Sequence, residues 1–62
     1  MEKGDRIRLV RMDDPHPVEP GTEGTVLWVD DRMMLAYVEW DDGRTLNLCL
    51  DVDRYEIVEG GR

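Results

Sequence analysis

An all-β fold is what this sequence predicts, and three observations predict it. No stretch of about ten residues keeps its apolar side chains at helical spacing. Several short runs instead alternate apolar with polar residues or are rich in β-branched ones. Aspartate, glycine and proline separate these runs, as turn residues separate strands. We therefore expect five short strands joined by turns.

The first two strands flank a long loop. Residues 5–12 alternate, which places Ile7 and Leu9 on one face and Arg6, Arg8 and Val10 on the other. Residues 24–31 form the second strand, which opens at Gly24 and closes at a pair of aspartates.

A hairpin is predicted for the third and fourth strands. Residues 33–40 and 44–50 are separated by Asp-Asp-Gly, and Asp-Gly between two apolar runs is a strong hairpin signal. Alternation gives the third strand two faces. One face holds Met34, Ala36, Val38 and Trp40, and the other holds Met33, Leu35, Tyr37 and Glu39.

The last part of the chain predicts one helical turn followed by a strand. Residues 51–54 form the turn, residues 55–59 the fifth strand, and residues 59–62 a frayed tail. Five strands with a long proline-containing first loop are the layout of a small SH3-like barrel, because closure removes edges that so small a sheet cannot protect. We predict a single SH3-like barrel domain over residues 1–62. An OB-type barrel, which needs longer strands, is the alternative.

Three prolines stiffen the long loop between the first two strands. Pro15 and Pro17 flank His16, the only histidine, and hold it in an extended path. The candidate metal ligands of the loop are Asp13, Asp14, His16 and Glu19. Their side chains are not expected to converge, so we predict no metal site. We interpret the loop as stiff and as part of a recognition surface.

Composition limits the function classes. A formal charge of −7 and scattered arginines disfavour a nucleic-acid partner. No apolar run has the length of a signal peptide or a membrane span, so a cytoplasmic protein is expected. The single Cys49 excludes an internal disulfide, and oligomerisation is the remaining way for a 62-residue chain to bury more surface.

No catalytic constellation stands out. A pair of Cys49 and His16 requires the loop to fold over the fourth strand. The aspartate pairs all fall at predicted turns, where turn chemistry explains them. We expect no enzyme, no catalytic residue and no cofactor.

An exposed apolar patch is predicted on the second and third strands. With Trp40 pointing inward, alternation turns every second residue of its strand outward. A small bulge that keeps Val26 and Val29 in the core turns the residues between them outward as well. The predicted interface residues are Leu27, Trp28, Met33, Leu35 and Tyr37. Contiguous exposed apolar surface on a charged protein indicates an interface, whereas a slipped alternation would place these residues in the core.

Two ligand sites are further hypotheses. An aromatic cage for a cationic side chain would use Trp28, Tyr37, Trp40 and Tyr55. An anion site beside the loop would use Arg8, Arg11, Asp14, His16 and Arg44. The competing interpretation of Arg44 is that it pairs with the aspartates of the neighbouring turn.

Three segments carry a resemblance that spans nearly the whole chain: Met-Asp-Asp-Pro at 12–15, Pro-Gly-Thr-Glu-Gly-Thr-Val at 20–26 and Trp-Asp-Asp-Gly-Arg-Thr-Leu at 40–46. The chain resembles a domain-of-unknown-function family of short bacterial and phage proteins. More distantly it is similar to the KOW and tudor-like barrels. The resemblance implies an SH3-like barrel encoded by a phage or mobile element, and hence the host-cell cytoplasm, but no activity. It also implies a small or polar residue where this chain has Leu27 and Trp28.

The leading hypothesis is a non-enzymatic binding module. It self-associates through its second and third strands and binds a host protein, as an inhibitor of host defence would. The first alternative is an oligomer that binds or sequesters a small anionic ligand such as a nucleotide signal. The second is a KOW-like nucleic-acid accessory domain.

Overall fold

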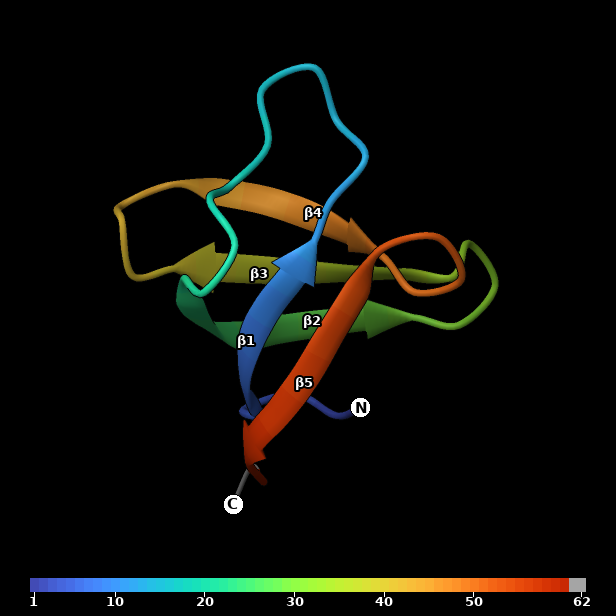
Figure 1. The fold of residues 1–62 in the computed structure, drawn as a ribbon. Helices are drawn as coiled ribbons and strands as arrows, with labels where there is room; N and C mark the ends of the chain where they lie inside the picture. Colours follow the sequence, from blue (N-terminus) through green and yellow to red (C-terminus); the bar gives the residue numbers. More distant parts are fainter. Residues whose placement is uncertain (61–62) are drawn as a thin grey trace.

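A computed structural model describes residues 1–60 as one antiparallel sheet of five strands (Figure 1). The strands are β1 (Arg6–Arg11), β2 (Glu23–Asp30), β3 (Leu35–Trp40), β4 (Thr45–Cys49) and β5 (Arg54–Glu59). Their order across the sheet is β4-β3-β2-β1-β5. The all-β prediction and the existence of the five strands are confirmed.

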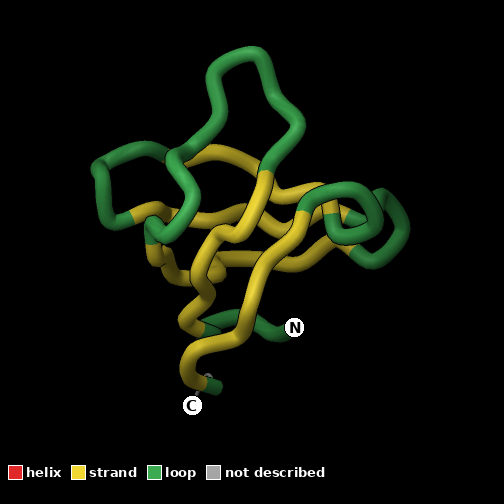
Figure 2. The backbone as a smooth tube through the Cα atoms, viewed as in Figure 1, coloured by secondary structure: helices red, strands yellow, loops and turns green. Residues whose placement is uncertain are grey.

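The sheet is not closed into a barrel, and the prediction of closure was wrong. β4 and β5 are the two edges, and β5 pairs only with β1. In Figures 1 and 2, β1 and β5 cross in front of β2 and β3, so the bent sheet covers one core from two sides. Met12 and Val18 from the long loop complete this core, which therefore needs no hydrogen bonds between the two edges.

The predicted helical turn before the last strand was also wrong. The N–H groups of Val52 and Asp53 both donate to the carbonyl of Cys49, at 3.2 and 2.8 Å, and β5 starts at the next residue. This single turn leaves no residues for a helix, and none occurs in residues 1–60. Of the predicted frayed tail, Glu59 belongs to β5 and pairs with Arg6, while residues 61–62 lie outside the described residues. No helix of the described chain is long and apolar enough to cross a membrane.

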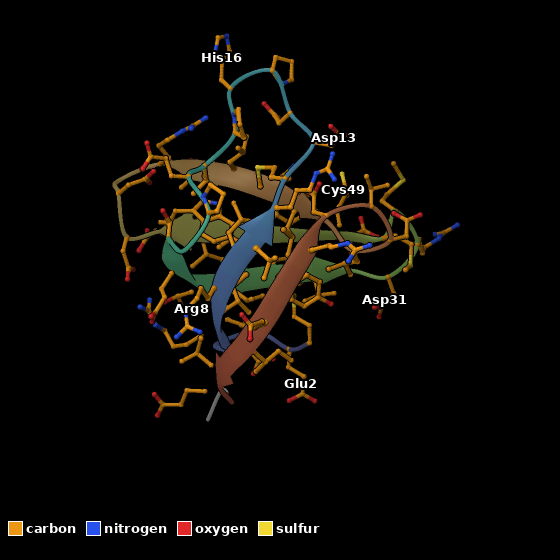
Figure 3. The ribbon with its side chains drawn as sticks, in the orientation of Figure 1. Glu2, Arg8, Asp13, His16, Asp31 and Cys49 are labelled. Carbon is orange, nitrogen blue, oxygen red and sulfur yellow. The ribbon has the colours of Figure 1, made fainter. Side chains whose placement is uncertain are left out.

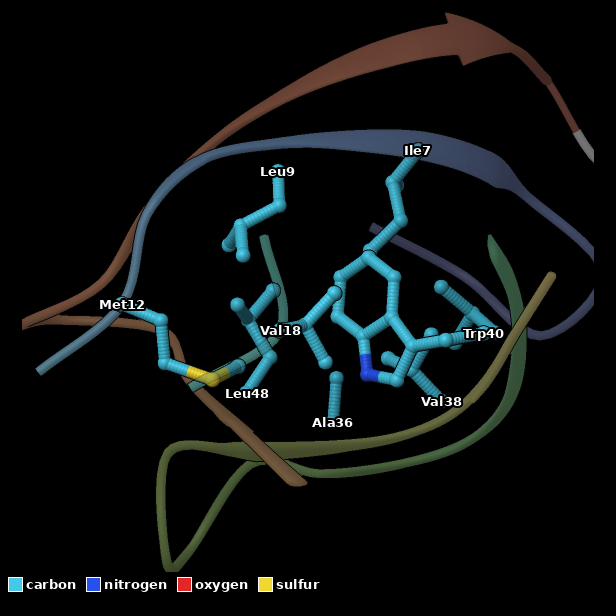
Figure 4. Packing of buried hydrophobic residues seen from close by; sticks show 9 residues of the cluster. Ile7, Leu9, Met12, Val18, Ala36, Val38, Trp40 and Leu48 are labelled. Atoms are coloured by element: carbon cyan, nitrogen blue, oxygen red, sulfur yellow. The ribbon is translucent and has the colours of Figure 1, made fainter. Parts of the chain in front are cut away.

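The core lies between the two crossing layers of the sheet (Figure 4). Its buried residues are Ile7, Leu9, Met12, Val18, Val26, Ala36, Val38, Trp40 and Leu48. Alternation in β1 and β3 is thereby confirmed. Trp40 is 1% exposed, and its indole Nε1 donates to the carbonyl of Leu46 at 3.0 Å, so its one polar atom is satisfied.

Met34 departs from the predicted alternation. It was expected to face inward, but β3 starts one residue later and Met34 is exposed. Its φ of 54° lies in the left-handed region, so the chain is still turning and strand alternation does not apply to it.

A bulge in β2 shifts its register against β3. Val26 is opposite Val38, but Trp28 is opposite Tyr37, so one extra residue lies between the two pairs. Val26 is buried and Val29 packs against the core, as the predicted bulge required. On the inner side, Gly24 fits closely: a Cβ there would lie 2.9 Å from the carbonyl oxygen of Glu39.

Candidate binding surfaces

Four of the five predicted interface residues lie on the side of β2 and β3 that faces away from the core, which we call the outer face. The fifth, Met33, lies in the turn that joins the two strands. Trp28 is 60% exposed and Met33 is 65% exposed. Leu27 and Tyr37 are exposed as well, and Leu35 is half-buried. None of the five belongs to the buried core. The alternative in which alternation slips and these residues fill the core is therefore wrong.

The bulge brings the two outward aromatic side chains into one row. Trp28 and Tyr37 are cross-strand partners, and Tyr37 is in turn opposite Asn47 of β4. Side chains directly opposite on one face have Cβ atoms about 5 Å apart, close enough for the two rings to form one surface. Without the extra residue, Leu27 would lie opposite Tyr37 in place of Trp28.

The predicted four-residue aromatic cage is not formed. Trp40 is buried on the inner side of β3, and Tyr55 packs against the same core from β5. Only Trp28 and Tyr37 share the outer face. The cage prediction failed because residue type alone does not tell which side of a bent sheet an aromatic ring takes.

The long loop is held at both ends by the core. Met12 and Val18 are buried, and the N–H of Asp13 donates to the Asp53 carboxylate at 3.1 Å. At the tip, the N–H of His16 donates to the carboxylate of Asp14 at 2.9 Å. Figure 3 shows His16 at the far end of the loop, away from the sheet. The loop therefore has the definite shape that its prolines predicted.

Arg44 braces this loop. Its guanidinium donates to the carbonyl of Pro17 at 3.1 Å and to that of His16 at 2.5 Å. Only its backbone N–H contacts the neighbouring turn, through the carboxylate of Asp42 at 2.9 Å. The prediction that the Arg44 side chain pairs with turn aspartates was thus wrong, whereas its expected proximity to the proline loop is confirmed.

The other arginines of the predicted anion site lie elsewhere. Arg8 faces Glu23 at 3.6 Å and Glu56 at 3.9 Å, and Figure 3 places it far from His16. Arg11 lies at the end of β1, where it pairs with Arg54 of β5, and its side chain makes no hydrogen bond or ion pair within residues 1–60. The structure therefore does not gather these side chains with Arg44 into one cationic site.

A separate ion pair ties β1 to the β3–β4 turn. The Arg6 guanidinium donates to both carboxylate oxygens of Asp41, at 2.9 and 2.6 Å, and to the Thr25 hydroxyl at 3.0 Å. The hydrogen bond from Arg6 lowers the pKa of Asp41 below its ordinary value, and the same contact raises the pKa of Arg6. Both groups are thus held in their charged forms.

Cys49 is a poor nucleophile in this environment. Burial raises the pKa of its thiol, and the nearby Asp53 carboxylate raises the pKa further, so the unreactive thiol form dominates at neutral pH. Residues 1–60 hold no pocket and no group of three or more His, Cys, Asp and Glu side chains suited to a metal ion.

The comparisons with known proteins give one match. A family model described as a domain of unknown function (DUF4314) matches residues 1–58. The chain belongs to this family. The resemblance seen in the sequence is thereby confirmed, and no curated protein and no solved structure matches the chain.

Two of the three segments that carry the resemblance contact each other: Gly24 of the second packs against Trp40 of the third. Arg44 of the third donates to the carbonyls of His16 and Pro17, which directly follow the first. These residues position the fold. Trp28 lies outside all three segments, and its side chain is 60% exposed.

Sequence reasoning missed the structural role of two acidic side chains. Asp53 is buried, and its carboxylate accepts hydrogen bonds from the N–H groups of Asp13 and Cys49. Asp5 is buried as well and accepts from the N–H of Glu2 at 2.7 Å. The only signal was an aspartate immediately before a strand. The same signal occurs at exposed turns and does not reveal burial.

Proposed function

We propose that this chain is a non-enzymatic protein-binding module and that the outer face is its contact surface. The observation that carries the proposal is the cross-strand pair of Trp28 and Tyr37, both exposed, with Leu27 exposed next to Trp28 in the chain and Met33 exposed in the turn between the two strands. Tryptophan, tyrosine and methionine are enriched at protein interfaces. In a chain with 37% charged residues, contiguous exposed apolar side chains are best explained by a partner that covers them.

The rest of the fold supports this role as a scaffold. We infer that the strand order and the crossed layers represent an SH3-like layout that stays open between β4 and β5. The braced proline loop closes one end of the core and keeps β1 and β2 in position. β2 and β3 form a bulged, well-paired surface, which limits the ordering entropy of binding.

The predicted anion site is not assembled as a whole. Arg8 already faces two glutamates and Arg44 donates to loop carbonyls, so of its three arginines only Arg11, the cross-strand partner of Arg54, has a side chain without a partner within residues 1–60. The same arrangement disfavours the phosphate backbone of a nucleic acid, as does the charge of −7.

The proposal is tested by affinity capture with matched variants. Wild-type protein, the double variant Trp28→Ser/Tyr37→Ser and the control Val52→Ser are immobilised and exposed to the same bacterial lysate. Val52 is 59% exposed in the turn before β5, so its replacement also removes exposed apolar surface. We expect one or more proteins captured by wild type and Val52→Ser and lost with the double variant. Equal capture by all three, or no specific capture by wild type, would overturn the proposal.

A further inference from the structure

The outward side chains of β2, β3 and β4 form three cross-strand rows. The rows are Thr25–Glu39–Thr45, Trp28–Tyr37–Asn47 and Asp30–Leu35–Cys49. Successive rows on one face of a sheet are separated by two residues, or about 7 Å. The aromatic row therefore has one carboxylate on each side, Glu39 in one neighbouring row and Asp30 in the other.

Neither carboxylate is neutralised by a basic side chain of the described residues. Glu39 takes part in no side-chain hydrogen bond or ion pair within residues 1–60. Asp30 accepts the backbone N–H groups of Arg32 and Met33 through Oδ1, at 3.1 and 3.2 Å, and its other oxygen accepts none within the same residues. Arg32, the one basic residue of this hairpin, forms no ion pair with Asp30.

The outer face is thus negative as well as apolar. None of the nine side chains in the three rows is lysine or arginine. The arginines of the adjoining strand β1 are already paired, Arg6 with Asp41 and Arg8 with Glu23. A protein with a net charge of −7 adds a long-range field of the same sign.

We infer that the occupant of the outer face is a basic peptide segment. One of its lysine or arginine side chains would lie against the rings of Trp28 and Tyr37, between Glu39 and Asp30. This inference rests on the proposed function and names the chemistry of its partner. An aromatic face attracts a cation through its ring quadrupole, and a carboxylate on either side adds charge-assisted hydrogen bonds. Apolar neighbours of that cation would cover Leu27 and Met33.

A second copy of the chain fits this surface less well. Two outer faces brought together would place Glu39 and Asp30 of one copy against the same carboxylates of the other, between two molecules of charge −7. Like charges brought together across an interface are strongly unfavourable. A basic segment would be attracted by the same carboxylates that repel a second copy.

The test uses two ten-residue peptides that differ only in charge. One alternates arginine with leucine, and the other alternates citrulline with leucine, because citrulline has the shape of arginine without its charge. Binding is measured by calorimetry at two salt concentrations, and chemical-shift changes locate the contact. We expect wild type to bind the arginine peptide roughly two to five times more tightly than the citrulline peptide, the range of a cation–π contact at an exposed site.

Three variants localise the effect. Glu39→Gln removes one carboxylate charge, Trp28→Leu removes the ring but keeps an apolar side chain, and Asp51→Asn removes an equal charge from an exposed turn outside the three rows. Glu39→Gln and Trp28→Leu are expected to remove most of the preference for the arginine peptide, and Asp51→Asn to leave it nearly intact. Circular dichroism verifies that each variant is folded.

The outcomes separate this inference from the proposed function. Equal binding of both peptides, weakened by Trp28→Leu, would overturn the basic partner but leave the outer face as a protein-binding surface. Equal weakening by Asp51→Asn and Glu39→Gln would show a diffuse charge effect and overturn the inference. Binding of neither peptide, or a dimer that protects Trp28, would overturn it as well. The proposed function would then be decided by the capture experiment.

Discussion

The two tryptophans of this chain occupy opposite sides of the same sheet. Trp40 in β3 is 1% exposed and surrounded by the core, with its indole N–H bonded to a backbone carbonyl. Trp28 in β2 is 60% exposed and lies beside Tyr37. The inner face therefore stabilises the fold, whereas the outer face leaves its tryptophan exposed to solvent.

The bulge in β2 is what separates these two roles. It lets Val26 and Val29 both contribute to the core while Leu27 and Trp28 are both exposed. An unbroken strand would place Val26 and Val29 on opposite faces. Mutations on the two sides should therefore have very different effects on stability.

The largest effect is expected for Trp40→Ala. Replacing a fully buried tryptophan by alanine removes about 3–5 kcal/mol of stability. A domain of this size has roughly 3–9 kcal/mol in total, so the variant should lose about half of its stability or more. Urea titration followed by circular dichroism measures the change. Trp28→Ala is the matched control and should shift the midpoint by less than about a quarter as much, because surface changes are usually small. Similar losses from both variants would contradict the comparison of the two faces.

Gly24→Ala should be the next most damaging change, although it adds only one methyl group. The new Cβ would lie 2.8 Å from a methyl carbon of Val38 and 2.9 Å from both the Glu39 carbonyl oxygen and a Trp40 ring carbon. Two of these neighbours belong to the core and the third is backbone, so relief requires β2 and β3 to separate, and we expect a loss of about 1–3 kcal/mol.

The control for Gly24→Ala is Gly60→Ala, where a Cβ would meet nothing within 4 Å. Thermal unfolding of the two variants measures the difference. A Gly24→Ala protein as stable as wild type would show that β2 and β3 pack less closely than described.

A buried and an exposed carboxylate allow a third comparison. Asp53→Ala leaves the N–H groups of Asp13 and Cys49 without their acceptor, which should cost about 1–3 kcal/mol. Asp51→Ala, at an exposed position of the same turn, should have almost no effect. Denaturant midpoints measure both. Equal losses would mean that the Asp53 hydrogen bonds do not hold the loop to β4.

The smallest effect is expected at the Arg6–Asp41 pair, which is exposed on the outer side. Because Arg6 lowers the pKa of Asp41 in the folded state, the pair stabilises the protein above the unfolded pKa of about 3.9. That contribution is lost as the pH falls through the lower folded pKa. Asp41→Asn should therefore reduce the melting temperature slightly at pH 7, and the difference from wild type should vanish at strongly acidic pH. A difference that is independent of pH would rule out the ion pair as its source.

Much of the local structure could be predicted from the sequence. Alternation correctly placed Ile7 and Leu9 on one face of their strand, and Ala36, Val38 and Trp40 on one face of theirs. The side-chain period of a strand is a local property that does not depend on which strands lie beside it. The Asp-Asp-Gly hairpin followed from turn chemistry, and Gly43 has the positive φ of 93° that glycine readily adopts. The resemblance to the family also followed from short sequence segments alone.

Which distant segments each strand and side chain contacts could not be predicted from local sequence patterns. The tertiary structure left the sheet open because Met12 and Val18 complete the core, and it directed Arg44 to loop carbonyls 27 and 28 residues away. The same long-range contacts buried Asp53 and left Trp28 exposed beside Tyr37. Strand periodicity depends on neighbouring residues, whereas closure, ion pairing and exposure depend on segments far apart in the chain, so the second group follows only from the folded arrangement.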